Sequence, residues 1–207
     1  IMSGAFPISS AKFETLGIKS MQNTLISKSA SGKKFTRQID GQRWAFTANI
    51  ITAKRSDIYG QLMAFIVKQR SGKENFTIIP PELEDTRGNE SGTLAVNGNQ
   101  SAGDTTITID GFVGDGDGRL KAGDFIKFAS HTKVYMVIND VTSSSGAATV
   151  TIEPPLVANI INDSTVVYNN VPFTVYLVGD VQQFGTTGAD KDGNLYYKFE
   201  LDVEEAL

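Results

Sequence analysis

Apolar and polar residues alternate along several stretches of this chain, which is the pattern of half-buried β-strands. The clearest stretch is 43–50, where Trp44, Phe46, Ala48 and Ile50 fall on one face. Residues 195–203 alternate in the same way. Shorter stretches of strand character lie at 12–18, 24–27, 35–39, 76–79 and 173–178. The pattern predicts a mainly β fold with antiparallel pairing.

Turn chemistry suggests how some of these strands are joined. Asp40-Gly41 stands between 35–39 and 43–50. Since both turn positions tolerate positive φ, this dipeptide predicts a hairpin between those two strands. Residues 190–194 predict a second hairpin, which joins a strand around 181–184 to the strand at 195–203.

One segment, 56–70, has helical rather than strand periodicity. Ile58, Leu62, Phe65 and Ile66 share a single face, as expected for a helix that packs on a sheet. Ser56 is the expected N-cap, and Gly72 follows the expected C-terminus. We interpret the apolar stripe as core packing rather than as a groove for a cofactor or partner.

The middle of the chain has a different character. After Pro80-Pro81 the sequence becomes polar and glycine-rich. Short strands are then expected at 93–96, 105–109, 124–128, 133–139 and 148–152. Residues 134–138 are almost continuously apolar, which predicts a strand buried on both faces.

These patterns predict a mainly β chain with one α-helix. We expect an antiparallel β-sandwich-like core, formed discontinuously by residues 1–88 and 171–207. A small β-barrel or sandwich module at 89–170 would be inserted between its two halves. The alternative is two successive domains, with the final strands belonging to the second.

Composition and charge limit the classes of function. The chain has 207 residues and a formal net charge of −4, with no cluster of basic residues, so a nucleic-acid partner is not expected. No apolar run is long enough for a membrane span, and no membrane partner is expected. The sequence contains no cysteine, which excludes disulfides, thiolate metal sites and cysteine nucleophiles.

Candidate chemistry is sparse. His131 is the only histidine and lies between two expected strands, so a serine–histidine triad would depend on it alone. The Asp-Gly loops at 115–118 and 190–194 resemble calcium loops superficially. Both lack the glycine at position six and the glutamate at position twelve of an EF-hand. We interpret them as tight turns, with a weak surface calcium site as the alternative. We interpret the acidic stretch 82–85 beside Arg87 as a solvated linker rather than as an acid/base pair.

We therefore assign no catalytic, cofactor-binding or metal-binding residues and expect no enzyme activity and no cofactor. A pair of carboxylates brought together only by the fold, as in glycosidases, stays open.

Several blocks of the sequence resemble small tail proteins of tailed bacteriophages, in particular distal tail proteins of the tail tip or baseplate. The blocks are Gln42-Arg43-Trp44-Ala45-Phe46-Thr47, the helix containing Ile58 to Phe65, Gln69-Arg70-Ser71-Gly72, and Phe76 to Pro81. The resemblance continues at 120–128, 133–137, 151–156 and 170–175. It implies a strand–helix–strand core that forms a ring, commonly a hexamer, at the end of the tail tube, with an outward-facing β module.

From the resemblance we expect a structural role in the virion tail. We also expect the chain to be made in the host cytoplasm. We expect a ring of copies of itself that joins the tail tube to tip, hub or fibre proteins. The position could equally be tip, baseplate wedge or neck. The alternative is a carbohydrate- or receptor-binding β module that stacks Trp44 or Tyr135 on sugar. A cell-wall hydrolase that uses His131 is the third hypothesis.

Overall fold

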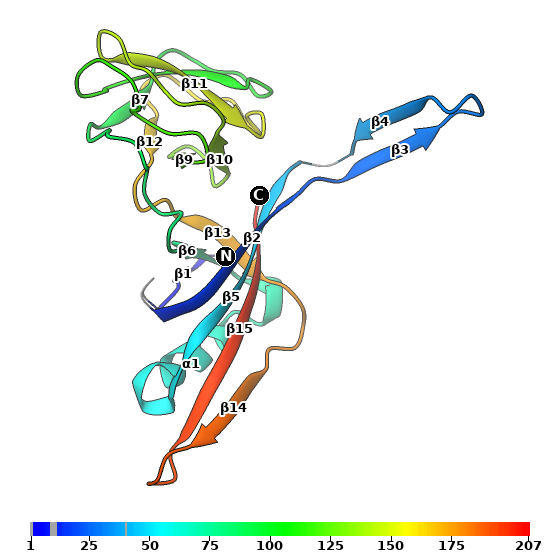
Figure 1. Cartoon of the computed structure of the whole chain (residues 1–207), viewed down its shortest axis with the longest axis vertical. Coiled ribbons are helices and arrows are strands. Elements are labelled where there is room, and N and C mark those ends of the chain that lie inside the picture. Colours follow the sequence, from blue (N-terminus) through cyan, green and yellow to red (C-terminus); the bar gives the residue numbers. More distant parts are fainter. Residues whose placement is uncertain (1, 9–11, 40) are drawn as a thin grey trace.

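The computed structural model describes residues 2–8, 12–39 and 41–207. The strands form three assemblies, which are a seven-stranded sheet, a closed barrel and a separate two-stranded arm. In Figure 1 the barrel lies at one end of the molecule, the arm projects from its side, and a long hairpin extends from the opposite end.

The seven-stranded sheet draws its strands from both ends of the chain. Its order is β1 (Met2–Ala5), β6 (Asn75–Ile78), β13 (Phe173–Leu177), β15 (Leu195–Glu205), β5 (Arg43–Lys54) and β2 (Phe13–Met21), with β14 (Phe184–Ala189) paired to β15. The pairs are antiparallel except β1 with β6. As the alternation predicts, Trp44, Phe46, Ala48 and Ile50 are all buried.

The predicted helix is present but begins differently. A π-helical turn, Arg55–Tyr59, leads into α1 (Gly60–Lys68). The Ser56 N-cap is wrong, because the hydroxyl of Ser56 donates to the carboxylate of Asp57 and no side chain caps the helix. Leu62 and Ile66 are buried against the sheet as expected, and Tyr59 is fully buried beside them. The stripe is therefore part of the core.

The predicted hairpin across Asp40-Gly41 is wrong. β4 (Lys34–Gln38) pairs with β3 (Thr24–Lys28), whereas β5 pairs with β2 and β15. The turn that reverses the chain is the polar segment 29–33, where Gly32 adopts φ +82° and the N–H of Ser29 donates to the carbonyl of Lys33. Asp40 itself lies outside the described residues.

The C-terminal hairpin is confirmed, with a shift in its first strand. β14 and β15 pair across residues 190–194. The strand expected around 181–184 begins at Phe184 instead, and the residues before it form a loop.

The middle segment closes into a barrel. Its strands follow the order β10 (Val134–Val137), β11 (Ala147–Glu153), β8 (Thr106–Asp110), β7 (Leu94–Val96), β12 (Thr165–Val167) and β9 (Phe125–Phe128). The prediction of a mainly β fold with one α-helix and a small β-barrel module is confirmed for the described part of the chain. We propose the discontinuous division at about residues 88 and 171, because the barrel strands lie between β6 and β13 in the sequence.

Strand β10 explains how the barrel meets the sheet. Tyr135 packs into the barrel core, and Val134 packs into the core of the sheet. On the neighbouring strand Phe125 meets the ring of Trp44 edge-on, with 5.1 Å between ring centres, and also contacts Phe173. The prediction of burial on both faces therefore holds for Val134, Tyr135 and Val137, because two different cores use the strand, whereas Met136 is half-buried and Ile138 is exposed.

Candidate functional site

The arm formed by β3 and β4 is the most exposed element of secondary structure in the described chain. Every residue of both strands is exposed to solvent. Figure 1 shows the arm extending from the end of β2 and β5, away from the barrel and the sheet. These two strands form a sheet of their own with no third strand. An isolated two-stranded ribbon is at best marginally stable in water, so the arm is an element to be completed by packing on something else.

The register of the arm sorts its side chains onto two faces. Leu25 pairs with Arg37 and Ser27 pairs with Phe35. Because directly opposed residues of antiparallel strands share a face, these side chains lie together. The N–H of Ile39 donates to the carbonyl of Asn23, which extends the same face by one pair. Leu25, Phe35 and Ile39 are each more than half exposed, and we call the face that they form the apolar arm face.

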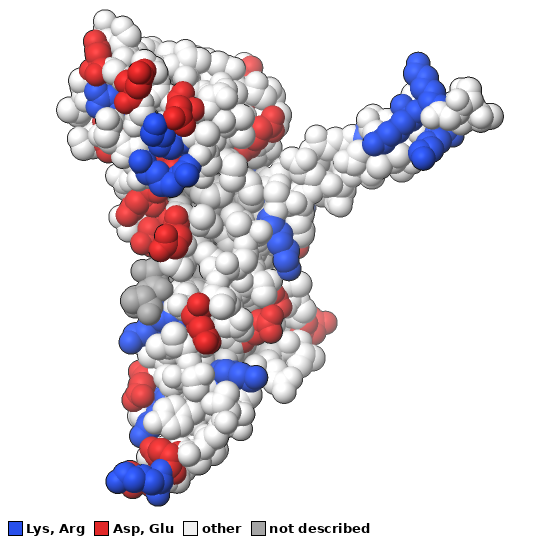
Figure 2. All heavy atoms as spheres, viewed as in Figure 1, with Lys and Arg blue, Asp and Glu red and all other residues white. Residues whose placement is uncertain are grey.

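The arm is also strongly basic, which corrects the statement from the sequence that the chain has no cluster of basic residues. Lys28, Lys33, Lys34 and Arg37 occur between residues 22 and 39, a range without Asp or Glu. The ammonium of Lys33 lies 5.4 Å from the ring centre of Phe35. In Figure 2 the Lys and Arg side chains gather on the arm, whereas acidic side chains are spread over the body. The arm therefore combines exposed apolar area with positive charge.

A buried polar junction fixes the barrel to the sheet. Lys133, at the entry to β10, forms an ion pair with Glu205 at the end of β15, and both side chains are at most 1% exposed. The other oxygen of Glu205 accepts the N–H of Val134 at 2.9 Å, and the Glu205 carboxylate also accepts the N–H of Trp44 at 3.1 Å. The indole of Trp44 donates to the carbonyl of Val134 at 2.9 Å. These bonds tie β10 of the barrel to β5 and β15 of the sheet.

Burial of the ion pair between Lys133 and Glu205 shifts the pKa values of both side chains. Burial lowers the pKa of Lys133 and raises the pKa of Glu205 from their ordinary values, because desolvation penalises both charged forms. Their mutual attraction and the N–H donors to Glu205 offset part of that penalty. The ammonium of Lys133 also donates to the amide oxygen of Gln42 at 2.7 Å. Such a pair has fixed geometry and is not accessible to a ligand.

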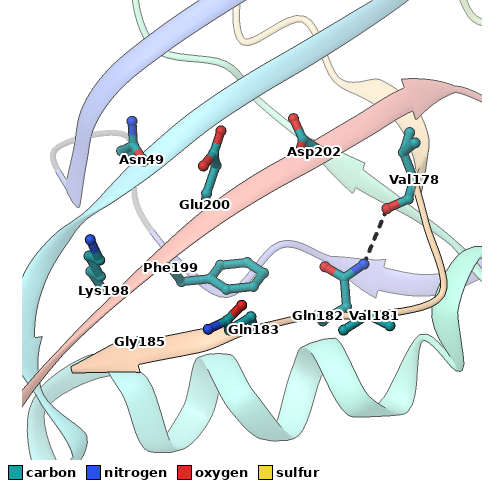
Figure 3. Close-up of a pocket in the computed structure, with 10 residues that line it drawn as sticks. All are labelled: Asn49, Val178, Val181, Gln182, Gln183, Gly185, Lys198, Phe199, Glu200 and Asp202. Carbon is teal, nitrogen blue, oxygen red and sulfur yellow. Dashed lines mark hydrogen bonds between the residues drawn. The ribbon is translucent and has the colours of Figure 1, made fainter.

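A shallow polar pocket of about 420 Å³ lies between β15 and the loop that precedes β14. Figure 3 shows Glu200 and Asp202 side by side on β15, with Gln182 folded back so that its amide donates to the carbonyl of Val178 at 3.2 Å. Asp202 already accepts the hydroxyl of Thr47 at 2.7 Å. Phe199, the aromatic residue of the lining, is buried and stacks on Phe184. The pocket offers hydrogen-bonding groups but no exposed ring for a sugar.

His131 lies where the sequence places it, between β9 and β10, and it is half-buried. Its Nε2 lies 2.7 Å from the hydroxyl oxygen of Tyr135, with which it forms a hydrogen bond. The same hydroxyl oxygen accepts the N–H of Val157 at 3.1 Å. Burial, and secondarily Lys127, lower the pKa of His131, which agrees with a structural role.

The two Asp-Gly loops use their carboxylates within the chain. Asp115 accepts the N–H of Gly146, and Asp117 accepts the hydroxyl of Thr142. Asp190 accepts the N–H groups of Asp192 and Asn194 and pairs with Lys54 at 2.6 Å. The pKa of Asp190 is lowered chiefly by Lys54 and Asn194. Each loop is thus held by its own hydrogen bonds, as the turn interpretation expects.

The aromatic residues considered for sugar stacking are not at the surface. Trp44 is 6% exposed and Tyr135 is fully buried. Burial also raises the pKa of Tyr135 to about 12. Neither ring presents a face to solvent, so the glycan-binding alternative loses both of its candidate residues.

The described residues provide neither a metal-binding cluster nor a membrane-spanning helix. No cluster of three or more His, Cys, Asp or Glu side chains suited to a metal ion occurs among them. No helix in that part of the chain has the length and apolar character needed to cross a membrane. The acidic residues at 82–85 are exposed or half-buried, and one of them, Asp85, accepts the N–H of Asn170 at 2.9 Å.

Sequence reasoning did not find the arm or the junction. The strands of the arm were expected, but β4 was given the wrong partner. The junction joins Lys133 and Glu205, which are 72 residues apart, and nothing local in the sequence relates them. The one available signal was a lysine directly before a strand expected to be buried on both faces.

One segment of the chain matches a known protein family. Residues 84–171 match the family described as "Distal tail protein pb9, B domain". This segment holds all six barrel strands and is less than half of the chain. No curated protein matches the sequence.

Proposed function

Because residues 84–171 match the B-domain family of a phage distal tail protein, we propose that this chain is a ring-forming subunit of a phage tail tip or baseplate. Copies of the chain close into a ring, commonly of six, that joins the tail tube to tip, hub or fibre proteins. The role is structural and without catalysis, and the chain is made in the host cytoplasm before it enters the virion tail.

The exposed arm is the observation that most strongly supports a ring. It exposes apolar side chains on a two-stranded ribbon that nothing else in the described chain covers. Large exposed apolar groups gathered on one element mark interaction sites. An element that leaves one subunit to pack on the next is a head-to-tail contact, and such contacts form rings when the rotation closes.

The match to the B-domain family supports a place in the tail, because it covers the barrel independently of the arm. The buried junction supports a rigid subunit. It holds the barrel in a fixed position on the sheet, as a ring that must present a module to neighbouring proteins requires.

The test is self-association of the intact chain. Native mass spectrometry or sedimentation velocity, across micromolar concentrations, is expected to show a closed oligomer for the parent chain. Leu25→Asp places a charge on the apolar arm face and is expected to abolish it. Val181→Asp makes the same kind of change at another exposed aliphatic residue, in the loop before β14, and is expected to assemble normally. A parent chain that stays monomeric, or a Leu25→Asp variant that assembles as the parent does, would overturn the proposal.

A further inference from the structure

An apolar groove lies where the start of β2 faces the turn that follows β6. It has a volume of about 440 Å³ and is lined by residues 13–16, Ile18 and residues 81–83. Phe13, Leu16 and Leu83 contribute apolar side chains that are only partly buried, and Ile18 is exposed. We call it the β2 groove. Its floor is continuous with the main core, since Phe13, Leu16 and Leu83 pack against that cluster.

The rim of the β2 groove is acidic. Glu14 and Glu82 belong to the lining, and both are exposed. Glu84 and Asp85 follow directly in the chain, so the turn after β6 carries three carboxylates in four residues. Among the described residues that line the groove there is no Lys or Arg. The groove thus offers apolar area surrounded by negative charge.

The arm has the complementary composition. Its apolar face carries Leu25, Phe35 and Ile39, and its four basic residues include Arg37 on that same face. Opposite charges around an apolar contact steer association and fix its register. A lysine or arginine within reach of Glu14 or Glu82 would meet a carboxylate that has no cation in the groove lining.

The length of the arm decides which copy supplies it. The eleven residues from Met21 to Ser31 span roughly 33 Å when extended at about 3.3 Å per residue. That distance is comparable to the diameter of a small domain, which has a radius of gyration of about 13 Å. The groove lies at the first residues of β2, and the arm leaves from the last, pointing away from the body in Figure 1. The arm therefore extends away from the groove of its own chain and reaches far enough to meet a neighbour.

We propose that the β2 groove is the receptor for the arm of a second copy of this chain, which lays Leu25, Phe35 and Ile39 on Phe13, Leu16 and Leu83 while its basic residues pair with Glu14 and Glu82. This contact rests on the proposed ring and specifies which surface closes it. It also covers the open edge of the sheet at β2, which otherwise presents unpaired backbone groups to solvent.

Cysteine cross-linking tests the contact directly, because the chain contains no cysteine of its own. One variant carries Ser27→Cys on the apolar arm face, and a second, size-tagged variant carries Thr15→Cys in the groove. The two are mixed and oxidised. We expect a disulfide between the two chains, at a yield at least tenfold above that of Ser27→Cys mixed with Thr187→Cys. Thr187 is a matched control, since it is also an exposed threonine on an edge strand.

Charge reversal provides a second readout. Glu14→Lys with Glu82→Lys is expected to weaken self-association at least tenfold, and so is Lys33→Glu with Arg37→Glu. An equimolar mixture of these two double variants is expected to regain association as an alternating ring with an even number of copies, because each arm then meets a groove of opposite charge. The quadruple variant carries both reversed surfaces and is expected to regain association by itself. All of these residues are exposed, so the variants are expected to fold, and circular dichroism of each checks this.

The outcomes separate the two proposals. If the parent chain assembles but Ser27→Cys links equally well to Thr187→Cys, or the quadruple variant stays dissociated, the groove is wrong and the ring stands. If the parent chain is monomeric and no link forms, both are wrong. A selective link to Thr15→Cys together with rescue by the quadruple variant establishes the contact.

Discussion

The barrel and the arm deal with unpaired strand edges in opposite ways. The barrel closes on itself, so each of its six strands has two neighbours, and side chains such as Leu94, Ile107 and Phe128 are fully buried. The arm leaves both of its outer edges open and exposes its aliphatic and aromatic side chains. Both are made of short strands of ordinary β-forming residues, so strand propensity does not distinguish them.

The barrel and the arm therefore differ in the source of their stability. A closed barrel buries its apolar area within the chain and has no edge to offer. A lone ribbon cannot bury either of its faces alone. The barrel is thus complete as a monomer, and the arm is completed by contact with another molecule. The matching family covers the complete element, and the proposed assembly depends on the incomplete one.

The largest effect is expected at the junction that makes the barrel part of the rigid body. Glu205→Ala removes the partner of Lys133 and leaves a buried ammonium without a counter-ion. We expect the free energy of unfolding to fall by about 3 to 5 kcal/mol, measured by urea denaturation of the isolated chain.

Two controls sharpen that result. Glu204→Gln, one residue earlier, disrupts a more exposed pair with Arg43 and is expected to cost less than about 1 kcal/mol. The double variant Lys133→Met with Glu205→Leu removes both charges, and it is expected to recover much of the stability lost in Glu205→Ala. If Glu205→Ala were as stable as the parent chain, the ion pair between Lys133 and Glu205 would not contribute to the stability of the fold.

The next prediction compares the barrel with the arm by truncating one aliphatic side chain to alanine in each. Ile107→Ala in the barrel core is expected to lower the free energy of unfolding by about 2 to 5 kcal/mol, because it removes buried methyl groups and leaves a cavity. Leu25→Ala on the arm is expected to change it by less than about 0.5 kcal/mol in the monomer. Both variants are measured at a protein concentration too low for assembly. Equal losses in the free energy of unfolding would contradict the difference between barrel and arm.

A smaller effect is expected where the sheet meets the barrel. Trp44→Phe keeps an aromatic ring beside Phe125 but loses the indole donor to the carbonyl of Val134. A buried acceptor left without its donor costs about 1 to 3 kcal/mol. We expect a loss in that range by chemical denaturation, together with faster exchange of the amides of β9 and β10. Unchanged exchange would show that the indole bond does not hold the barrel in place.

The smallest effect is a dependence of barrel stability on pH. The pKa of His131 is lowered in the folded chain by burial and by Lys127, so the folded state resists protonation. His131 therefore adds stability above its unfolded pKa of about 6.5, and that stability is lost as the pH falls below this value. We expect His131→Gln to flatten the decrease in the free energy of unfolding between pH 7 and pH 5. An identical pH profile in the variant would contradict the lowered pKa of His131 in the folded chain.

Local patterns predicted much of the fold. Alternation placed β5 and the buried face containing Trp44, Phe46 and Ile50. Short apolar runs between glycine-rich turns placed most barrel strands within two residues of their ends. The three-residue strand β12 and the four-residue strand β1 were missed, although β7 is equally short and was found.

Pairing and long-range contacts were harder to predict. Asp40-Gly41 has the chemistry of a hairpin turn, but β5 pairs instead with β2 and β15. Its core-facing residues are buried only in that larger sheet, so tertiary packing outweighed the local turn signal. The helix begins in a π-helical turn that periodicity at 3.6 residues does not reveal. The junction between Lys133 and Glu205 depends on the assembled fold alone.

Hydrogen exchange of the arm amides, followed by mass spectrometry on the monomer and on the assembled oligomer, tests the central comparison most directly. We expect residues 24–38 to exchange almost at the unfolded rate in the monomer and to become protected on assembly, while the barrel amides are protected in both states. An arm already protected in the dilute monomer, or one still unprotected in the oligomer, would contradict the claim that a second copy of the chain completes it.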